Sequence, residues 1–364
     1  MQVVHRFLAL LLALTLPSAA LFSQTSPPVS PTAENLITLK VTVDAKDGKP
    51  VEGLSVADFK VLDNKNPEPI VSFRALTGQQ APTEVIVVLD ALNLPYGRVS
   101  YARQQIEQFL SANDGKLSHP TKLAVLQDNG LRIQPDFTTD GNALRESLDA
   151  YGVGLRSIPR STGFYGAVER YQISLNGLHQ IVAHEVKRPG RKLILWVSAG
   201  WPLLSGPEVD LSTAQQSGLF GNVVALSTEM RQGQITLDAV NPIGASEDVS
   251  QTIYYENFLK GVRDAKRAEI GDLGLQVLAV QSGGLVLNGS NDVAGLLKRA
   301  VEQTEAIYEL SFAPAPGEHD NEYHQIQVQI AKPGFTAHTS SGYYARPKYS
   351  LTENQKPLNV VPTR

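Results

Sequence analysis

The sequence contains no cysteine. This absence excludes disulfide bonds, thiolate zinc sites, iron–sulfur clusters and cysteine nucleophiles. The chain also has no long basic run, and its 32 Lys and Arg residues are outnumbered by 36 Asp and Glu residues, which gives a formal net charge of −4. Binding to a phosphate backbone requires concentrated positive charge, so we expect no nucleic acid partner.

The apolar run at the N-terminus, residues 7–16, is too short for the roughly 20 residues that span a bilayer. His5 and Arg6 precede it, and the small residues 18–20 follow it as a cleavage pattern. We therefore expect residues 1–23 to be a signal peptide, with export to the periplasm or the extracellular space and no membrane anchor after its removal. A buried N-terminal helix is the alternative, but no polar residues alternate with the apolar ones to give it a solvent face.

The remaining composition is that of a folded protein long enough for two domains. The 364 residues are 42% hydrophobic and 19% charged, which is ordinary globular usage. Residues 24–36 are rich in Ser, Thr and Pro, which favours an extended, solvated linker. Residues 347–364 contain Pro347, Pro357 and Pro362, and we expect them to form a flexible tail.

Two segments that flank the middle of the chain show the alternation of apolar and polar residues typical of half-buried strands. The first segment, residues 37–80, includes the alternating run 37–43. The second segment, residues 307–346, includes the alternating run 323–330. Neither segment has enough strands to close a β-sandwich alone. We therefore expect the two segments to be the two parts of one small β-sandwich.

From residue 84 to residue 306, apolar runs alternate with helical patterns. The run 84–90 is almost entirely apolar and ends in a carboxylate, as expected for a parallel strand buried on both faces. The expected strands are 84–90, 122–126, 131–135, 192–197, 235–240 and 285–287, and the expected helices are 98–112, 141–150, 164–186, 251–270, 272–281 and 292–306. This alternation predicts a doubly wound, Rossmann-like α/β domain over residues 84–306, inserted between the two parts of the sandwich.

Short motifs near both ends of the folded region carry a family resemblance. They are Gly48-Lys49-Pro50-Val51, Gly53-Leu54, Asp58-Phe59, Tyr308-Glu309-Leu310 and Gly342-Tyr343-Tyr344-Ala345. In their order and spacing they resemble the secreted VWFA-related domain proteins known from Acidobacteria, and the α/β middle is similar to a von Willebrand factor type A (VWA) domain. The resemblance covers roughly residues 37–346.

The resemblance implies a metal-ion-dependent adhesion site in which Asp-x-Ser-x-Ser, a Thr and a second Asp hold Mg²⁺. Here Asp90 is kept, but Leu92 and Leu94 stand where the two Ser residues belong. Thr162 matches the Thr, and Ala199 stands in the place of the second Asp. We therefore expect a degenerate site with no metal and no cofactor. A cation would have to use substitute oxygens such as that of Asn93, whereas the structural alternative is that Asp90 and Asn93 cap the turn after the strand.

Other chemistry is weakly indicated. His179 and His184 are five residues apart, so they do not share one helix face, and no metalloprotease motif is present. The polar group Glu318, His319, Asp320, Glu322 and His324 is typical of a solvated hairpin. Gly283-Gly284 is followed by no Lys-Ser/Thr and is expected to end a helix. No Gly-x-Ser-x-Gly elbow accompanies a serine, and we expect no catalytic residues.

The favoured hypothesis is a secreted, non-enzymatic binding or scaffold protein whose partner is an unidentified protein. We expect it to bind through loops at the top of the sheet, including a long insertion at 201–234, with Asp90, Asn93, Thr162 and Ser198 as candidate binding residues. Metal-dependent adhesion through a rearranged site is the alternative. A hydrolase is a third hypothesis, against which the absence of a recognisable nucleophile–base pair argues.

Overall fold

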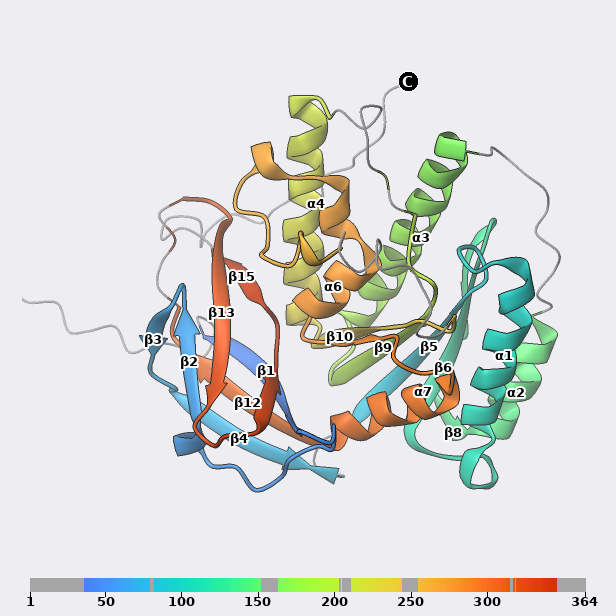
Figure 1. The fold of residues 1–364 in the computed structure, drawn as a ribbon, viewed down its shortest axis with the longest axis horizontal. Helices are drawn as coiled ribbons and strands as arrows, with labels where there is room; N and C mark the ends of the chain where they lie inside the picture. Colours follow the sequence, from blue (N-terminus) through green and yellow to red (C-terminus); the bar gives the residue numbers. More distant parts are fainter. Residues whose placement is uncertain are drawn as a thin grey trace, which may run out of the picture.

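The structure of the chain is a computed structural model (Figure 1). It describes residues 36–78, 82–151, 163–202, 204, 211–243, 255–314, 317 and 319–345. The expected signal peptide and tail, and Thr162, lie outside the described residues. Within those residues, no helix combines the length and the apolar character needed to cross a membrane.

A seven-stranded sheet of mostly parallel strands forms the centre of the α/β part. Its strands are β5 (Thr83–Asp90), β6 (Lys116–Gln127), β7 (Gly130–Ile133), β8 (Thr138–Asp140), β9 (Arg191–Val197), β10 (Ile235–Val240) and β11 (Val286–Leu287). They lie in the order β11-β10-β9-β5-β6-β7, with β8 also paired to β6. Strands β7 and β8 run antiparallel to β6, whereas the other pairings are parallel.

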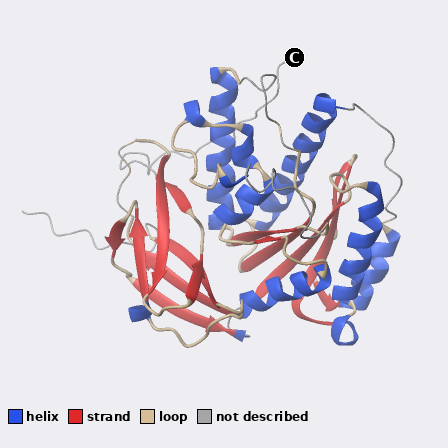
Figure 2. Ribbon diagram, viewed as in Figure 1, coloured by secondary structure: helices blue, strands red, loops and turns tan. Residues whose placement is uncertain are grey.

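Helices cover both faces of this sheet (Figure 2). They are α1 (Tyr96–Leu110), α2 (Gly141–Ala150), α3 (Gly163–Glu185), α4 (Thr213–Gln232), α6 (Leu275–Gln281) and α7 (Val293–Glu302). Val85 and Val87 of β5 belong to a core shared with α1, α2 and α7. Ile86 and Val88 belong to a second core, shared with α3, α4 and α6. Alternate side chains of one strand therefore serve two cores, which explains its continuous apolar sequence.

Two antiparallel sheets lie beside the α/β part (Figure 1). Their strands are β1 (Ile37–Ala45), β2 (Phe59–Asp63), β3 (Asn66–Glu68), β4 (Ser72–Thr77), β12 (Ala306–Phe312), β13 (Glu322–Ile330), β14 (Phe335–His338) and β15 (Gly342–Ala345). The strand orders are β14-β1-β12-β4 and β15-β13-β2-β3.

The N-terminal and C-terminal segments interleave in these sheets. Strand β12 lies between β1 and β4, with Leu39 opposite Leu310, and β13 pairs with β2. Leu39, Leu310, Val61 and Tyr343 are all buried in one apolar core that spans both sheets. The chain is thus a mixed α/β protein with a mostly parallel central sheet and flanking antiparallel sheets.

Two expectations about the α/β part were wrong. The expected loop insertion at 201–234 contains α4, because β9 and β10 are parallel neighbours and the chain must cross over between them. Gly218 and Gly221 lie inside α4 and weaken its helical signal. The described part of 251–270 does not form the expected long helix; it consists mainly of turns and the short 3₁₀ helix Ala265–Arg267.

Candidate functional site

Asp90 lies at the carboxyl edge of the central sheet, where β5 ends. Its side chain is fully buried, with 0% of the residue exposed. Oδ1 accepts a hydrogen bond of 2.9 Å from the backbone N–H of Asn93. Oδ2 accepts hydrogen bonds from Asn93 Nδ2 at 2.8 Å, Trp196 Nε1 at 3.0 Å and Ser198 Oγ at 2.8 Å. Four donors of the chain itself therefore converge on one carboxyl group.

The donors come from the ends of two neighbouring strands, and one of the donor residues also contacts α3. Asn93 lies in the turn between β5 and α1, and its Nδ2 also donates to Ser174 Oγ of α3 at 2.8 Å. Ser174 in turn donates to the carbonyl oxygen of Arg170. Trp196 is on β9, and Ser198 follows that strand with its backbone N–H bonded to the carbonyl of Val240. The carboxyl group thus ties together the ends of β5 and β9 and the middle of α3.

The electrostatics of the carboxyl group follow from this setting. Burial raises the pKa of Asp90 above its ordinary value, because the charged form is poorly solvated. The hydrogen bonds from Asn93, Trp196 and Ser198 act in the opposite direction and favour the charged form. An ionised carboxylate accepts about four hydrogen bonds. Three of the four donors act on Oδ2 and one on Oδ1, so the chain holds the carboxyl group mainly through Oδ2.

The positions of the expected hydroxyl ligands are used for packing. Leu92 is buried in the core shared with α3, α4 and α6, and Leu94 in the core shared with α1, α2 and α7. Ala199 packs against the second of these cores. In the part of the chain that the structure describes, no three His, Asp or Glu residues are grouped so as to hold a metal ion.

Three of the four binding residues predicted from the sequence lie together in the structure. Asp90, Asn93 and Ser198 form one hydrogen-bonded cluster, whereas Thr162 lies outside the described residues. Ser174 and Trp196 belong to the same cluster and were not predicted from the sequence. The tryptophan had a weak signal, since an indole in a buried strand two residues before a polar turn needs a hydrogen-bond acceptor.

Exposed apolar side chains lie in the first turns of α1 and α3, the two helices whose residues flank or contact the Asp90 cluster. Tyr96 begins α1 and is 63% exposed, and Tyr165 in the first turn of α3 is 77% exposed. Val168, one turn further along α3, is 38% exposed. Ser174, the level at which α3 meets the Asp90 cluster, is about three turns from the start of the helix. The first turns of α3 therefore project beyond the cluster, and Figure 1 shows α3 and α4 rising above the central sheet.

The histidines that were considered in the sequence do not form a joint site. His179 is half-buried, and burial lowers its pKa. His184 is 60% exposed at its side chain and bonds to Glu185. Glu318 lies outside the described residues, and His319 bonds to the backbone of Asp320.

His324 departs from the expected solvated hairpin. It lies on β13, 5% exposed, and its Nδ1 is 2.9 Å from both carboxylate oxygens of Asp63. Tyr343 donates to Asp63 Oδ2 at 2.6 Å, which completes a buried triad. The hydrogen bond that His324 donates to Asp63 raises the pKa of His324, against the effect of burial. The triad links β2, β13 and β15, three neighbouring strands of one antiparallel sheet.

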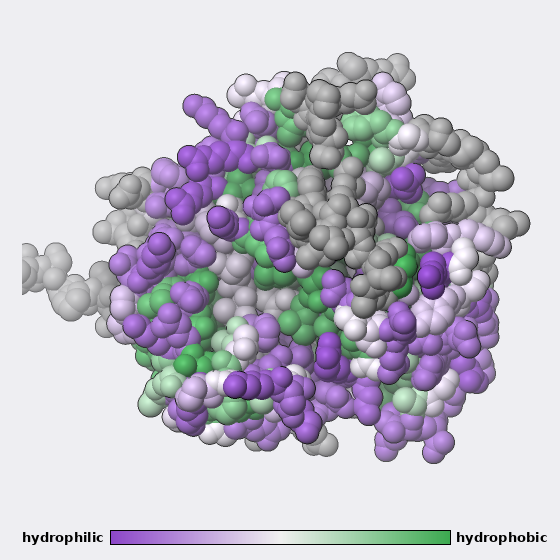
Figure 3. Space-filling model, in the orientation of Figure 1, coloured by the Kyte–Doolittle hydropathy of each residue, from purple (hydrophilic) through white to green (hydrophobic). Residues whose placement is uncertain are grey.

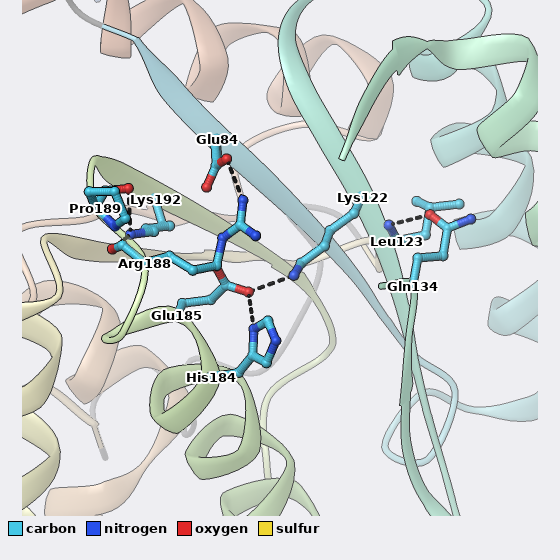
Figure 4. A network of polar contacts seen from close by, with 9 residues as sticks. All are labelled: Glu84, Lys122, Leu123, Gln134, His184, Glu185, Arg188, Pro189 and Lys192. Carbon is cyan, nitrogen blue, oxygen red and sulfur yellow. Dashed lines mark hydrogen bonds and ion pairs between the residues drawn. The ribbon is translucent and has the colours of Figure 1, made fainter. Parts of the chain in front are cut away.

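A second polar network lies near the opposite edge of the sheet, where the strands begin (Figure 4). Lys122 Nζ donates to Glu185 Oε1 at 2.5 Å, and the two side chains are 1% and 0% exposed. Burial alone would raise the pKa of Glu185, but the hydrogen bonds from Lys122 and His184 outweigh it, so this pKa is lowered. Arg188 bridges Glu185 and Glu84. This network joins the end of α3 to β5 and β6.

Comparison with known proteins identifies no family. No protein-family model matches the chain, and no curated protein matches its sequence. Three solved structures with partial similarity are the human COPII-coat protein Sec24c, proximal thread matrix protein 1 from the mussel byssus and a mutant of the PilB minor pilin from Streptococcus sanguinis.

These structural similarities are distant. The sequence identities to the three proteins are 11%, 10% and 11%, and the TM-scores are 0.33, 0.34 and 0.34. The matches cover 75%, 63% and 61% of this chain. The chain spans 44%, 49% and 62% of the respective matched chains. We draw no functional argument from them.

Proposed function

We propose that this chain is an exported, non-enzymatic protein-binding or scaffold protein with a VWA-like α/β domain whose metal site is degenerate. One observation carries the proposal. The Asp90 carboxyl group, which would be the central metal ligand, is fully buried and accepts hydrogen bonds from Asn93, Trp196 and Ser198. A carboxylate engaged in this way orders the edge of the sheet.

The energetics support a structural role for Asp90. A cation at Oδ2 of Asp90 would have to displace the Trp196 and Ser198 donors, and a buried donor that loses its acceptor costs roughly 1–3 kcal/mol. Mg²⁺ dehydrates reluctantly and requires several oxygen ligands. Leu92 and Leu94 supply none, and their burial in the two cores holds them in place. The sheet edge is therefore built to be rigid without a cation.

A binding surface for a protein is supported by the exposed side chains around this rigid edge. Tyr165 and Val168 on the projecting turns of α3, and Tyr96 at the start of α1, present apolar area to solvent. Aromatic residues are enriched in protein interfaces because they bury a large area for little loss of conformational entropy. We place the partner-binding surface on these residues.

The alternative function, divalent-metal-dependent adhesion through a rearranged site of Asp90, Asn93 and Thr162, is favoured by one observation. Oδ1 of Asn93 is buried, and within the described residues it has no hydrogen-bond partner. A buried amide oxygen without a partner is a potential ligand for a hard cation.

Thermal unfolding distinguishes the two functions. The full chain is melted in EDTA and then with millimolar Mg²⁺, Mn²⁺ or Ca²⁺, and Asn93→Ser is melted beside it. The proposed function predicts the same unfolding temperature in EDTA and with each cation. A rise of several degrees with one cation, lost in Asn93→Ser, would replace it by metal-dependent adhesion, because a ligand that binds the native state stabilises it.

Site-specific photo-crosslinking tests the binding surface. A photoreactive phenylalanine analogue is placed at Tyr165 and, as a control, at Arg145 on the exposed side of α2. In the cell-envelope fraction of the source organism we expect a discrete adduct from position 165 that excess unlabelled protein competes away and that excess Tyr165→Ala, Val168→Ser protein does not. Equal labelling from both positions, or equal competition by both proteins, would contradict the proposed surface.

A further inference from the structure

A cleft lies between the antiparallel sheet that contains β1 and the amino-terminal ends of the central strands. One wall is formed by Lys40 and Thr42 of β1, and the other by Arg191 and Lys192 of β9 and Thr236 of β10. The space between the walls is about 550 Å³, including the part open to solvent.

The cleft continues into a recess beside α6 and the β15 strand, because Lys40, Thr236 and Ser282 line both. In Figure 3 the surface is recessed between the antiparallel sheets and the centre of the molecule. The cleft adjoins the amino-terminal ends of β5, β9 and β10, at the opposite edge of the central sheet from Asp90. It is therefore separate from the site described above.

The charges that line the cleft are unequal. Among the described residues, its cationic side chains are Lys40, Arg191, Lys192 and, when protonated, His338, whereas Asp238 is the carboxyl group in the lining. Burial raises the pKa of Asp238 to about 7, so near neutral pH this group carries only part of a negative charge. Cations therefore outnumber anions among the side chains that line the cleft.

Two of these cations are already engaged by the chain. Lys192 Nζ donates to the backbone carbonyl oxygens of Arg188, Pro189 and Gly190, part of which Figure 4 shows. His338 Nε2 lies 3.2 Å from Asp44 Oδ2. Lys192 and His338 therefore already have hydrogen-bond or ion-pair partners within the chain.

Lys40 and Arg191, in contrast, both lie beside the carboxylate of Glu309, which also forms an ion pair with Arg74. Glu309 lies directly opposite Lys40 in the β1–β12 pair. Its Oε1 is 3.3 Å from Arg191 Nη1, and its Oε2 is 3.3 Å from Arg74 Nη1. One carboxylate therefore faces three cationic side chains.

Lys40 and Arg191 both have N–H donors that no described residue accepts. Arg191 is 7% exposed, and its Nε atom is buried without a hydrogen-bond partner in the described part of the chain. Lys40 Nζ forms no hydrogen bond or ion pair with any described residue. Burial, and the charge of Arg191, lower the pKa of Lys40 well below its ordinary value. An unpaired, desolvated cation of this kind is costly to the native state unless an anion accompanies it.

We propose that this cleft binds the oxyanion group of a small molecule, a carboxylate or a phosphate, between Lys40 on one wall and Arg191 on the other. Arginine presents a planar set of N–H donors that matches both groups, and a lysine adds a point charge. The two walls belong to different sheets, so the bound anion would join the antiparallel sheet to the central sheet. Binding would therefore stabilise the contact between the two parts of the molecule.

The test is thermal unfolding of the full chain with increasing inorganic phosphate, acetate or succinate, at an ionic strength held constant with sodium chloride. We expect a saturable rise in unfolding temperature of a few degrees with phosphate or with the carboxylates, since a ligand that binds the native state stabilises it. A response to phosphate alone identifies a phosphate ligand, and a response to acetate or succinate alone identifies a carboxylate.

Two variants locate the effect. Lys40→Met keeps the apolar stem and removes the ammonium group, so the anion-dependent rise should be lost. Lys60→Met, on the exposed side of β2, is the matched control and should retain it. No saturable rise with any of the three anions, or the same rise in Lys40→Met as in the unmodified chain, overturns the proposal.

A measurement on the unmodified chain provides the answer should Lys40→Met fail to fold. Reductive methylation modifies neutral amines, and mass spectrometry locates the modified lysines. We expect the anion that stabilises the chain to protect Lys40 and to leave Lys60 unprotected. Equal methylation of Lys40 with and without that anion would also overturn the proposal.

Discussion

The indole Nε1 of Trp196 donates a hydrogen bond of 3.0 Å to Oδ2 of Asp90, and both groups are completely buried. The two residues lie on neighbouring parallel strands, where Val88 is opposite Trp196 and the end of β5 meets the end of β9. The contact shows how this sheet edge is ordered: an aromatic side chain from one strand fixes the carboxyl group at the end of the next.

The hydrogen bond between these residues is testable with a matched pair of variants. Trp196→Phe removes the donor and leaves Oδ2 with one partner fewer, so we expect a loss of about 1–3 kcal/mol in the free energy of unfolding, measured with denaturant. Trp201→Phe is the control, because Trp201 is also buried and its Nε1 has no partner among the described residues. Its loss should be smaller, and equal losses would show that packing alone is responsible.

Stability should decrease as the pH rises from acid to mildly alkaline values. Burial raises the pKa of both Asp238 and Asp272 to about 7. A carboxyl group whose folded pKa lies above its unfolded pKa binds more protons in the native state, so its contribution is present below about pH 4 and is lost as the pH rises through about 7. Unfolding temperatures should fall between about pH 6 and 8, on the order of one pKa unit either side of neutrality.

The variant Asp238→Asn should flatten this pH dependence, because its amide oxygen can still accept the backbone N–H of Leu285 and it does not titrate. Glu146→Gln, on the exposed side of α2, is the charge-matched control and should leave the slope unchanged. An unchanged slope in Asp238→Asn would show that the carboxyl group of Asp238 titrates in its ordinary range.

His324 should titrate above its ordinary range. The hydrogen bond that His324 donates to Asp63 is the main cause of the raised pKa, and burial acts against it. Its stabilising contribution is therefore complete below the unfolded pKa and is lost as the pH rises through the folded one. An NMR titration should show a pKa for His324 above the ordinary value of histidine, and Asp63→Asn should lower it. The same pKa in Asp63→Asn as in the unmodified chain would contradict a charged pair.

The ion pair between Lys122 and Glu185 should be strongly coupled. Lys122→Met removes the nearest cation from a carboxylate that is 0% exposed, and we expect a loss on the order of 3–5 kcal/mol in the free energy of unfolding. The double variant Lys122→Met, Glu185→Leu should recover most of that loss, because an apolar pair of similar size avoids the desolvation of both charges. Additive losses in a double-mutant cycle would show that the pair is not coupled.

Local pattern was sufficient for much of the fold. The runs that became β5 and β9 are apolar in their centres because both faces of each strand are covered there. The alternation in β13 reflects a strand with one buried and one exposed face over much of its length. The position of Asp90 at a strand end was also predictable, as was its contact with Asn93, since a carboxylate commonly caps the turn that follows it.

Contacts between distant parts of the chain were not predictable from these patterns. Helix α4 was missed because its glycines weaken the helical signal, and the helix is required by the crossover between β9 and β10. The His324–Asp63–Tyr343 triad joins positions 261 and 280 residues apart. No periodicity links such positions, because their proximity arises only when two ends of the chain pair in the sandwich.

The sequence by itself determined most of the strand and helix types, the absence of cysteine chemistry and the apolar character of positions 92 and 94, because each depends on residue identity or local spacing. The tertiary structure decided which groups meet. It placed four donors on Asp90 and left Lys40 and Arg191 facing one shared carboxylate. Burial and hydrogen-bond partners depend on how distant segments pack, and these two properties set the charge and chemistry of each site.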